Sequence, residues 1–97
     1  MNTENIYIDA VGLARDGKQK IAFDILSHKY AHLSTDEVNN AISLGKQLND
    51  SLWLLADKYY DKSINEAEFK DQIRLICPSL SLDMINGLFS RALYEAR

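Results

Sequence analysis

The sequence predicts an all-α fold, a compact antiparallel bundle of four or five helices in a single domain over residues 1–97. Apolar residues recur at intervals of three and four along most of the chain, which is the period of an amphipathic helix. No segment of useful length alternates with the period of two that is typical of strands. Four glycines and one proline leave few places to turn, which favours a few long helices with short connections.

Two helices are predicted in the first third of the chain. Asn2 or Thr3 can cap a first helix whose apolar residues share one face. The segment RDGK, residues 15–18, contains an Asp-Gly turn pair, and it is expected either to end this helix or to kink a longer one at Gly17. The apolar stripes before and after the break are Ile6, Tyr7, Ala10, Val11 and Ala14, and Ile21, Ala22, Ile25, Leu26, Tyr30 and Leu33.

The middle of the chain predicts one long helix. Ser34 and Glu37 form a capping box, in which the serine side chain accepts from the Glu37 amide and the glutamate accepts from the Ser34 amide. Apolar residues then repeat at three and four over about six turns of helix. They are Val38, Ala41, Ile42, Gly45, Leu48, Leu52, Leu55, Ala56 and Tyr59.

Two further helices complete the predicted bundle. Asn65 and Glu68 form a second box-like start, and Pro78 ends that helix because proline disfavours helical geometry at Cys77 before it. Ser81 is predicted to cap the last helix. The apolar residues of these helices are Phe69, Ile73 and Ile76, and Ile85, Leu88, Phe89, Ala92 and Ala96.

Composition limits where such a protein can act. An apolar fraction of 46% is ordinary for a globular chain and argues against disorder. No apolar run approaches the ~18 residues of a membrane-spanning helix, and the N-terminus lacks the basic and apolar regions of a signal peptide. Cys77 is the only cysteine, so no internal disulfide can form. We therefore expect a cytoplasmic protein.

The charge distribution argues for a protein partner over nucleic acid. The formal net charge is −3, and residues 36–71 hold eight acidic and four basic residues. A protein that neutralises phosphates normally carries a basic stripe. The acidic middle of this chain favours a basic protein partner instead.

No arrangement of residues in the sequence supports catalysis, and neither a cofactor nor a metal is expected. His28 and His32 stand four apart on one predicted helix, a spacing that lets two imidazoles share a metal, but Asp24 is the only nearby carboxylate on the same face. Both histidines are expected to face solvent. Cys77 lies at the C-terminal end of its helix, where the helix dipole does not activate a thiol, and it is expected to be a buried apolar residue.

One edge of the long helix combines aromatic and acidic residues. On a helical wheel Tyr59 lies with the apolar stripe and is predicted to be core. Trp53 and Tyr60 lie at the edge of that stripe, so either another helix covers them or they are exposed. If they are exposed, they form with the neighbouring carboxylates a surface suited to a basic protein, because aromatic anchors supply contact area and acids attract lysine and arginine. The predicted partner-binding residues are Asp50, Trp53, Asp57, Tyr60 and Asp61.

The segment KSINEAEFKDQIRLIC, residues 62–77, resembles the first-helix segment of the colicin nuclease immunity proteins. The resemblance lies in its glutamate-alanine-glutamate-phenylalanine start and its terminal isoleucine-cysteine. It implies a small, acidic, cytoplasmic helical protein that binds a nuclease toxin and blocks it, with an adjacent tyrosine pair in the recognition surface. In that family the segment opens the chain, whereas here it begins at residue 62, so no family residue is carried over.

These observations predict a non-enzymatic acidic binding protein that neutralises or regulates a basic protein partner, with immunity to a bacterial toxin as the leading interpretation. A phage-type inhibitor and a helical adaptor of a larger complex are the alternatives within the same class. A small nucleic-acid-binding regulator that uses the C-terminal helices is the rival from another class. It is disfavoured because the start of its recognition helix would present Leu82, Asp83 and Met84 to DNA instead of basic residues.

Overall fold

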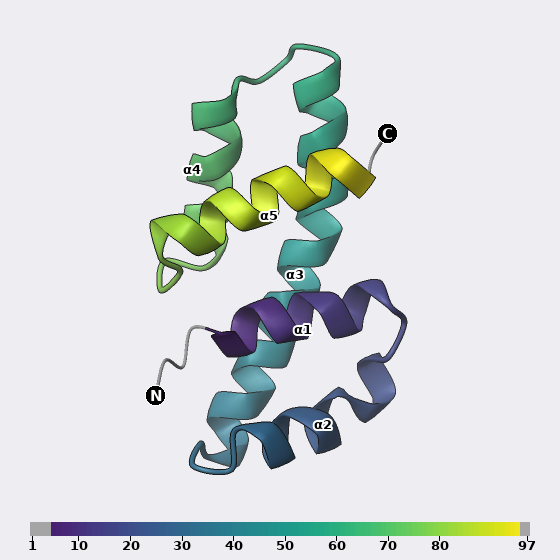
Figure 1. Ribbon diagram of the computed structural model, residues 1–97, viewed down its shortest axis with the longest axis vertical. Helices are drawn as coiled ribbons and strands as arrows, with labels where there is room; N and C mark the ends of the chain where they lie inside the picture. The colour runs from purple at the N-terminus through teal and green to yellow at the C-terminus, as the bar shows by residue number, and fades with distance from the viewer. Residues whose placement is uncertain (1–4, 96–97) are drawn as a thin grey trace. The chain divides into compact units, whose positions relative to one another are not determined.

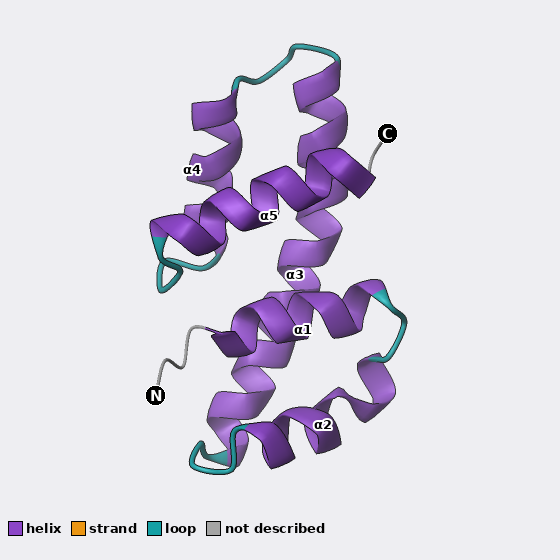
Figure 2. Ribbon diagram, in the orientation of Figure 1, coloured by secondary structure: helices purple, strands orange, loops and turns teal. Residues whose placement is uncertain are grey.

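The computed structural model describes residues 5–95, and the regular elements of this part of the chain are helices joined by short turns (Figure 1, Figure 2). The elements in chain order are α1 (Asn5–Arg15), the 3-10 turn η1 (Gln19–Ile21), α2 (Ala22–Lys29), α3 (Thr35–Tyr60), α4 (Glu66–Ile76) and α5 (Leu82–Glu95). Residues 5–95 contain no strand, so the predicted all-α class with four or five helices is confirmed. Within that range, no helix combines the length and the apolarity needed to cross a membrane.

The contacts divide the chain into two compact units, with the boundary inside α3. The N-terminal unit extends to Asn49 and contains α1, η1, α2 and the first part of α3. The C-terminal unit begins at Asp50 and contains the rest of α3, α4 and α5. Each unit is therefore built from two short helices and one part of the long helix.

In the N-terminal unit, three helices meet around a small apolar core. Its buried residues are Ile6, Ala10, Leu26, Tyr30, Val38 and Ala41. The crossing of α1 and α3 is close at Gly45, where an added Cβ would collide with the Cβ of Ala10. The glycine therefore permits an approach that a larger residue would prevent.

A polar connection joins α1 to the end of α2. The Tyr30 hydroxyl donates to Asp9 Oδ2 at 2.7 Å, and Lys29 Nζ lies 2.8 Å from the same oxygen. Burial of the tyrosine raises its pKa above the ordinary value, and the hydrogen bond to Asp9 acts in the same direction. This contact spans 21 residues of sequence, and it links α1 to the residue that directly follows α2.

The first break in the chain is a helix end rather than a kink. Gly17 has a φ of +73°, its amide donates to the carbonyl of Ala14 at 3.2 Å, and the Lys18 amide donates to that of Leu13 at 2.8 Å. Together these bonds form the Schellman arrangement that commonly ends helices at a glycine. The alternative of one longer kinked helix is thereby excluded.

The predicted helix starts are confirmed at three of four positions. Ser34 and Glu37 exchange hydrogen bonds of 3.2 and 3.3 Å, and Asn65 and Glu68 exchange bonds of 2.8 and 3.1 Å, so both capping boxes are present. The Ser81 hydroxyl accepts from the Met84 amide at 3.3 Å. The caps proposed at residues 2–3 and the apolar position 96 lie outside the described residues.

The C-terminal unit is held together by an aromatic cluster. Tyr59 from α3 contacts Phe69 from α4 and Phe89 from α5 edge to face, with ring centroids 6.3 and 5.4 Å apart. The Phe69 and Phe89 centroids are 4.9 Å apart. Tyr59 is thus a packing residue, as its wheel position predicted. As predicted, α4 ends before Pro78, with Cys77 in a non-helical conformation and buried.

Candidate partner-binding surface on α3

The five residues predicted to bind a partner all lie in the C-terminal unit and are all exposed. Trp53 is 46% exposed and Tyr60 47%, so neither aromatic is covered by another helix. At roughly 100° per residue, the four that belong to α3 fall within an arc of about 80° on that helix. Asp50, Asp57 and Asp61 are the exposed acids among the five. The structure therefore brings the predicted residues together along one side of α3.

Tyr60 is exposed, but its hydroxyl and its ring both contact other residues. Its hydroxyl donates to the carbonyl of Leu93 on α5 at 2.6 Å, and its ring meets that of Tyr59 edge to face at 6.0 Å. A side chain held in this way loses less conformational entropy when a partner covers it. The bond to α5 could not be read from spacing within one helix.

Asp61 follows the last residue of α3 and carries a stable negative charge. Its Oδ1 accepts a hydrogen bond from the Ser63 amide at 2.9 Å. Hydrogen bonds from Ser63 lower the pKa of this carboxyl below its ordinary value. Asp61 therefore stays ionised at neutral pH and below it.

Leu54 is a further member of this surface that sequence reasoning missed. It is 65% exposed, and on the helical wheel it lies beside Asp50 and Asp57 on the side of α3 that faces away from the apolar stripe. Its place four residues after Asp50 was a signal in the sequence. We call the set of Asp50, Trp53, Leu54, Asp57, Tyr60 and Asp61 the α3 strip.

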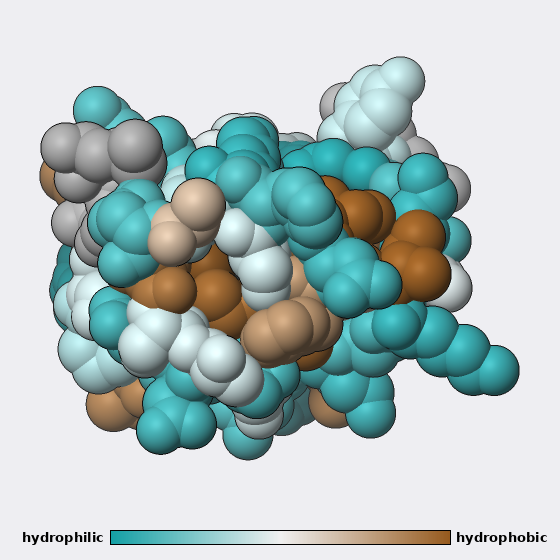
Figure 3. All heavy atoms as spheres, turned by 90° about the horizontal axis from the view of Figure 1, so that it is seen from below, coloured by the Kyte–Doolittle hydropathy of each residue, from teal (hydrophilic) through white to brown (hydrophobic). Residues whose placement is uncertain are grey.

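Elsewhere in residues 5–95, exposed apolar residues occur, but not in this arrangement. Single exposed apolar side chains are normal on protein surfaces. On the face drawn in Figure 3, hydrophobic patches are small and bordered by hydrophilic side chains. The α3 strip differs because three large apolar or aromatic residues share one side of a helix with carboxylates. The other large exposed hydrophobic residues are Ile21, Ile25, Leu75, Leu82 and Tyr94.

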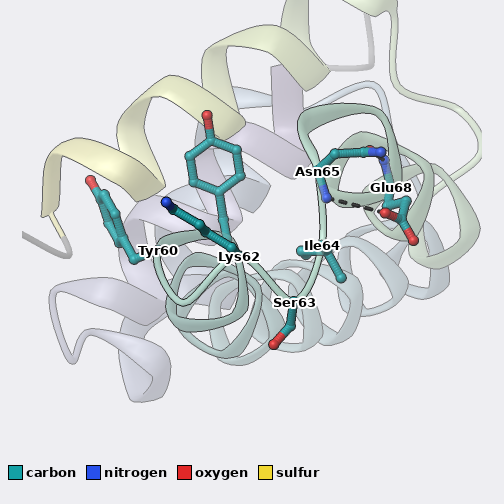
Figure 4. A pocket seen from close by; sticks show the side chains of 7 residues that line it. Tyr60, Lys62, Ser63, Ile64, Asn65 and Glu68 are labelled. Carbon is teal, nitrogen blue, oxygen red and sulfur yellow. Dashed lines mark hydrogen bonds between the residues drawn. The ribbon is translucent and has the colours of Figure 1, made fainter.

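A cavity of about 580 Å³ adjoins the end of the α3 strip, at the turn between α3 and α4 (Figure 4). Residues 59–60, 62–65 and 68 line it, so Tyr60 belongs to both features. Figure 4 shows Tyr60 and Lys62 on one side of the turn and Asn65 and Glu68 on the other, with Ile64 between them. No sequence pattern indicated this cavity, because its lining comes from two helices and the turn that joins them.

Lys62 has an unusual backbone conformation at this turn. Its φ is +68°, and α3 ends there with the same pair of hydrogen bonds as α1, from Lys62 to Tyr59 at 3.2 Å and from Ser63 to Lys58 at 2.9 Å. Glycine is the usual residue at such a position, since a side chain strains the left-handed conformation.

His28 and His32 are both exposed, as predicted, but the prediction that they share one helix is wrong. α2 ends at Lys29, so His32 lies in the following turn and the two histidines do not share a helix. His28 Nδ1 lies 2.9 Å from the carbonyl oxygen of Asp24. Tyr30, the residue after Lys29, has left helical geometry and is buried inside the N-terminal unit, where its hydroxyl donates to Asp9. Among residues 5–95, no three histidine, cysteine or acidic side chains are grouped for a metal ion.

Fold and site together define an all-α protein with an exposed acidic and aromatic helix face. No protein-family model, curated protein or solved structure matches the chain. The chemistry of the α3 strip is therefore the basis for a functional proposal.

Proposed function

We propose that this protein binds a basic protein partner through the α3 strip and so neutralises or regulates it, as an immunity protein does for a bacterial toxin. The observation that carries the proposal is the exposure of Trp53 and Tyr60 on the same side of α3 as two carboxylates, with a third exposed carboxylate directly after the helix. The resemblance of residues 62–77 to colicin nuclease immunity proteins supports a toxin as the partner class.

The two kinds of residue in the α3 strip have different parts in binding. Tryptophan and tyrosine are enriched among the residues whose truncation costs an interface about 2 kcal/mol or more. Carboxylates at the edge of an interface accelerate encounter with a basic surface, and salt weakens this effect. The strip extends over eleven residue steps, about 16 Å of helix, which is enough for the centre of an interface but not for all of it.

The charges of α4 and α5 support a protein partner over nucleic acid. α5 has Asp83 in its first turn, where a recognition helix would need basic or polar readers. Arg91 Nε lies 3.4 Å from Glu95 of the same helix. On α4, Lys70 and Arg74 are paired with Glu66 and Asp71 at 2.7 and 3.4 Å. The basic residues of these helices are thus offset by neighbouring acidic residues.

A phage-type inhibitor or an adaptor would use the same α3 strip to bind another basic protein.

A comparison of charge variants tests this proposal. The parent, a strip variant (Asp57→Asn with Asp61→Asn) and a control variant (Asp24→Asn with Asp71→Asn) are immobilised and exposed to an extract of the source cells. Both variants lose the same charge from exposed positions. We expect a basic protein to be retained by the parent and the control, and to elute from the strip variant at lower salt. Equal retention by all three would contradict the proposal.

The captured partner then tests the toxin interpretation. If the partner is a toxin, its expression alone should arrest growth, and co-expression with the parent should restore growth. Tyr60→Ala should restore growth less well than the parent. Growth arrest by the partner that the parent does not relieve would leave binding intact but exclude immunity.

A further inference from the structure

Two aromatic side chains that line the cavity at the α3–α4 turn are held in place by contacts within the protein. Tyr59 is held by its edge-to-face contacts with Phe69 and Phe89, and Tyr60 by its bond to the Leu93 carbonyl. Ile64 is half-buried between them and α4. A site whose walls are already ordered binds a ligand at a lower cost in entropy.

One carboxylate of the cavity is also fixed in position. Glu68 Oε1 accepts from the Asn65 amide at 3.1 Å as part of the capping box. The two oxygens of a carboxylate together offer about four acceptor sites, of which the cap uses one. The cavity thus combines aromatic rings with an anchored acid.

We propose that this cavity receives an arginine side chain of the basic partner. A guanidinium is a planar cation that stacks on aromatic rings and forms directed hydrogen bonds with a carboxylate, whereas an ammonium is a compact charge that does neither as well. The volume of about 580 Å³ exceeds one side chain, which leaves room for the residues that flank the arginine. The proposal rests on the proposed function for the source of the arginine, since Tyr60 joins the cavity to the α3 strip.

Lys62 acts against this ligand and so provides a sharp test. It lines the cavity and carries a positive charge that repels a guanidinium. Its φ of +68° suits glycine better than lysine. Lys62→Gly should therefore strengthen arginine binding, while Glu68→Gln should weaken it. Glutamine also serves in a capping box, so Glu68→Gln removes the charge and keeps the helix start.

The probe is Nα-acetyl-argininamide, titrated into the whole protein and followed by amide NMR shifts. We expect saturable shifts at residues 59–68 in the parent, affinity reduced roughly five- to tenfold in Glu68→Gln, and affinity increased in Lys62→Gly. The matched control is Glu66→Gln, which removes the same charge from the same turn of α4 outside the cavity lining, and it should bind as the parent does.

Three results would overturn the inference. They are the absence of saturable shifts in the parent, equal binding of Nα-acetyl-leucinamide, and unchanged affinity in Glu68→Gln. The probe occupies only the cavity and touches no other part of an interface. If the probe does not bind, a positive capture experiment still supports the α3 strip as a binding surface. If no partner is captured, saturable binding of the probe still supports an arginine site. If both succeed, Glu68→Gln should also weaken the captured partner; an unchanged affinity for that partner would overturn the arginine assignment.

Discussion

Tyr59 and Tyr60 are adjacent in the chain but differ in what surrounds them. Tyr59 packs among phenylalanines, while Tyr60 is 47% exposed and bonded to the carbonyl of Leu93. The wheel position of Tyr59 predicted its packing, because a one-residue step turns a helix by about 100°. The hydrogen bond from Tyr60 to Leu93 depends on the position of α5, and the sequence pattern of α3 does not indicate that position.

Tyr30 gives a prediction in which stability depends on pH. Burial and the hydrogen bond to Asp9 raise its pKa, so the folded state favours the neutral phenol. The stabilisation of the folded state by the neutral Tyr30 phenol is complete below the ordinary tyrosine pKa of about 10 and is lost as pH rises above it. At neutral pH, Tyr30→Phe should therefore unfold at a lower urea concentration than the parent. Its free energy of unfolding should be lower by about 1 kcal/mol or more.

The difference in free energy of unfolding between Tyr30→Phe and the parent should narrow as the pH is raised beyond about 10. Only the parent then loses the stabilisation from a neutral phenol at position 30. Urea midpoints at neutral and alkaline pH measure both effects. A gap that stays constant across that range would contradict the assigned coupling between Tyr30 and Asp9.

Helix ends could be predicted from the sequence where the residues that form the end lie close together in the chain. The capping boxes at Ser34 and Asn65 were found because each needs only residues within four positions. The end of α2 was missed, and the predicted stripe to Leu33 is interrupted by the turn after Lys29. The residue after that end, Tyr30, bonds to Asp9 at a distance of 21 residues in the sequence, and local periodicity does not contain such a contact.

Two glycines in helices should respond in opposite ways to substitution by alanine: Gly45, at the crossing of α1 and α3, should lose stability, and Gly87, on α5, should gain it. A Cβ at Gly45 would collide with the Ala10 Cβ and come within 2.8 Å of the Ala10 carbonyl carbon, whereas one at Gly87 on α5 meets nothing within 4 Å. Gly45→Ala should therefore destabilise the protein, because overpacking costs about 1–3 kcal/mol and outweighs a helix-propensity gain of about 1 kcal/mol.

Gly87→Ala is the matched control, because it makes the same change in an exposed part of a helix and should keep the propensity gain of up to about 1 kcal/mol. Urea unfolding of both variants beside the parent measures the two shifts. If Gly45→Ala were as stable as the parent, α1 and α3 would not approach as closely as described.

For the whole molecule, the apolar stripe of α3 continues without interruption across the boundary at Asn49 and Asp50. The sequence therefore contained no signal for two compact units, and a single domain stays a prediction about folding. The α3 strip could be predicted because it lies along one helix. The cavity beside it could not, since its walls depend on contacts between α3, α4 and α5.

Partner binding by the α3 strip is tested by the binding kinetics of the captured partner with folded variants of the strip. Tyr60→Ala should weaken binding chiefly through faster dissociation, with a loss of about 2 kcal/mol or more for a buried aromatic anchor. Asp57→Asn with Asp61→Asn should slow association, and this loss should shrink as salt is raised. Circular dichroism and urea unfolding establish that each variant is folded. If both variants are folded and bind with the rate constants of the parent, the α3 strip is only a solvated helix face.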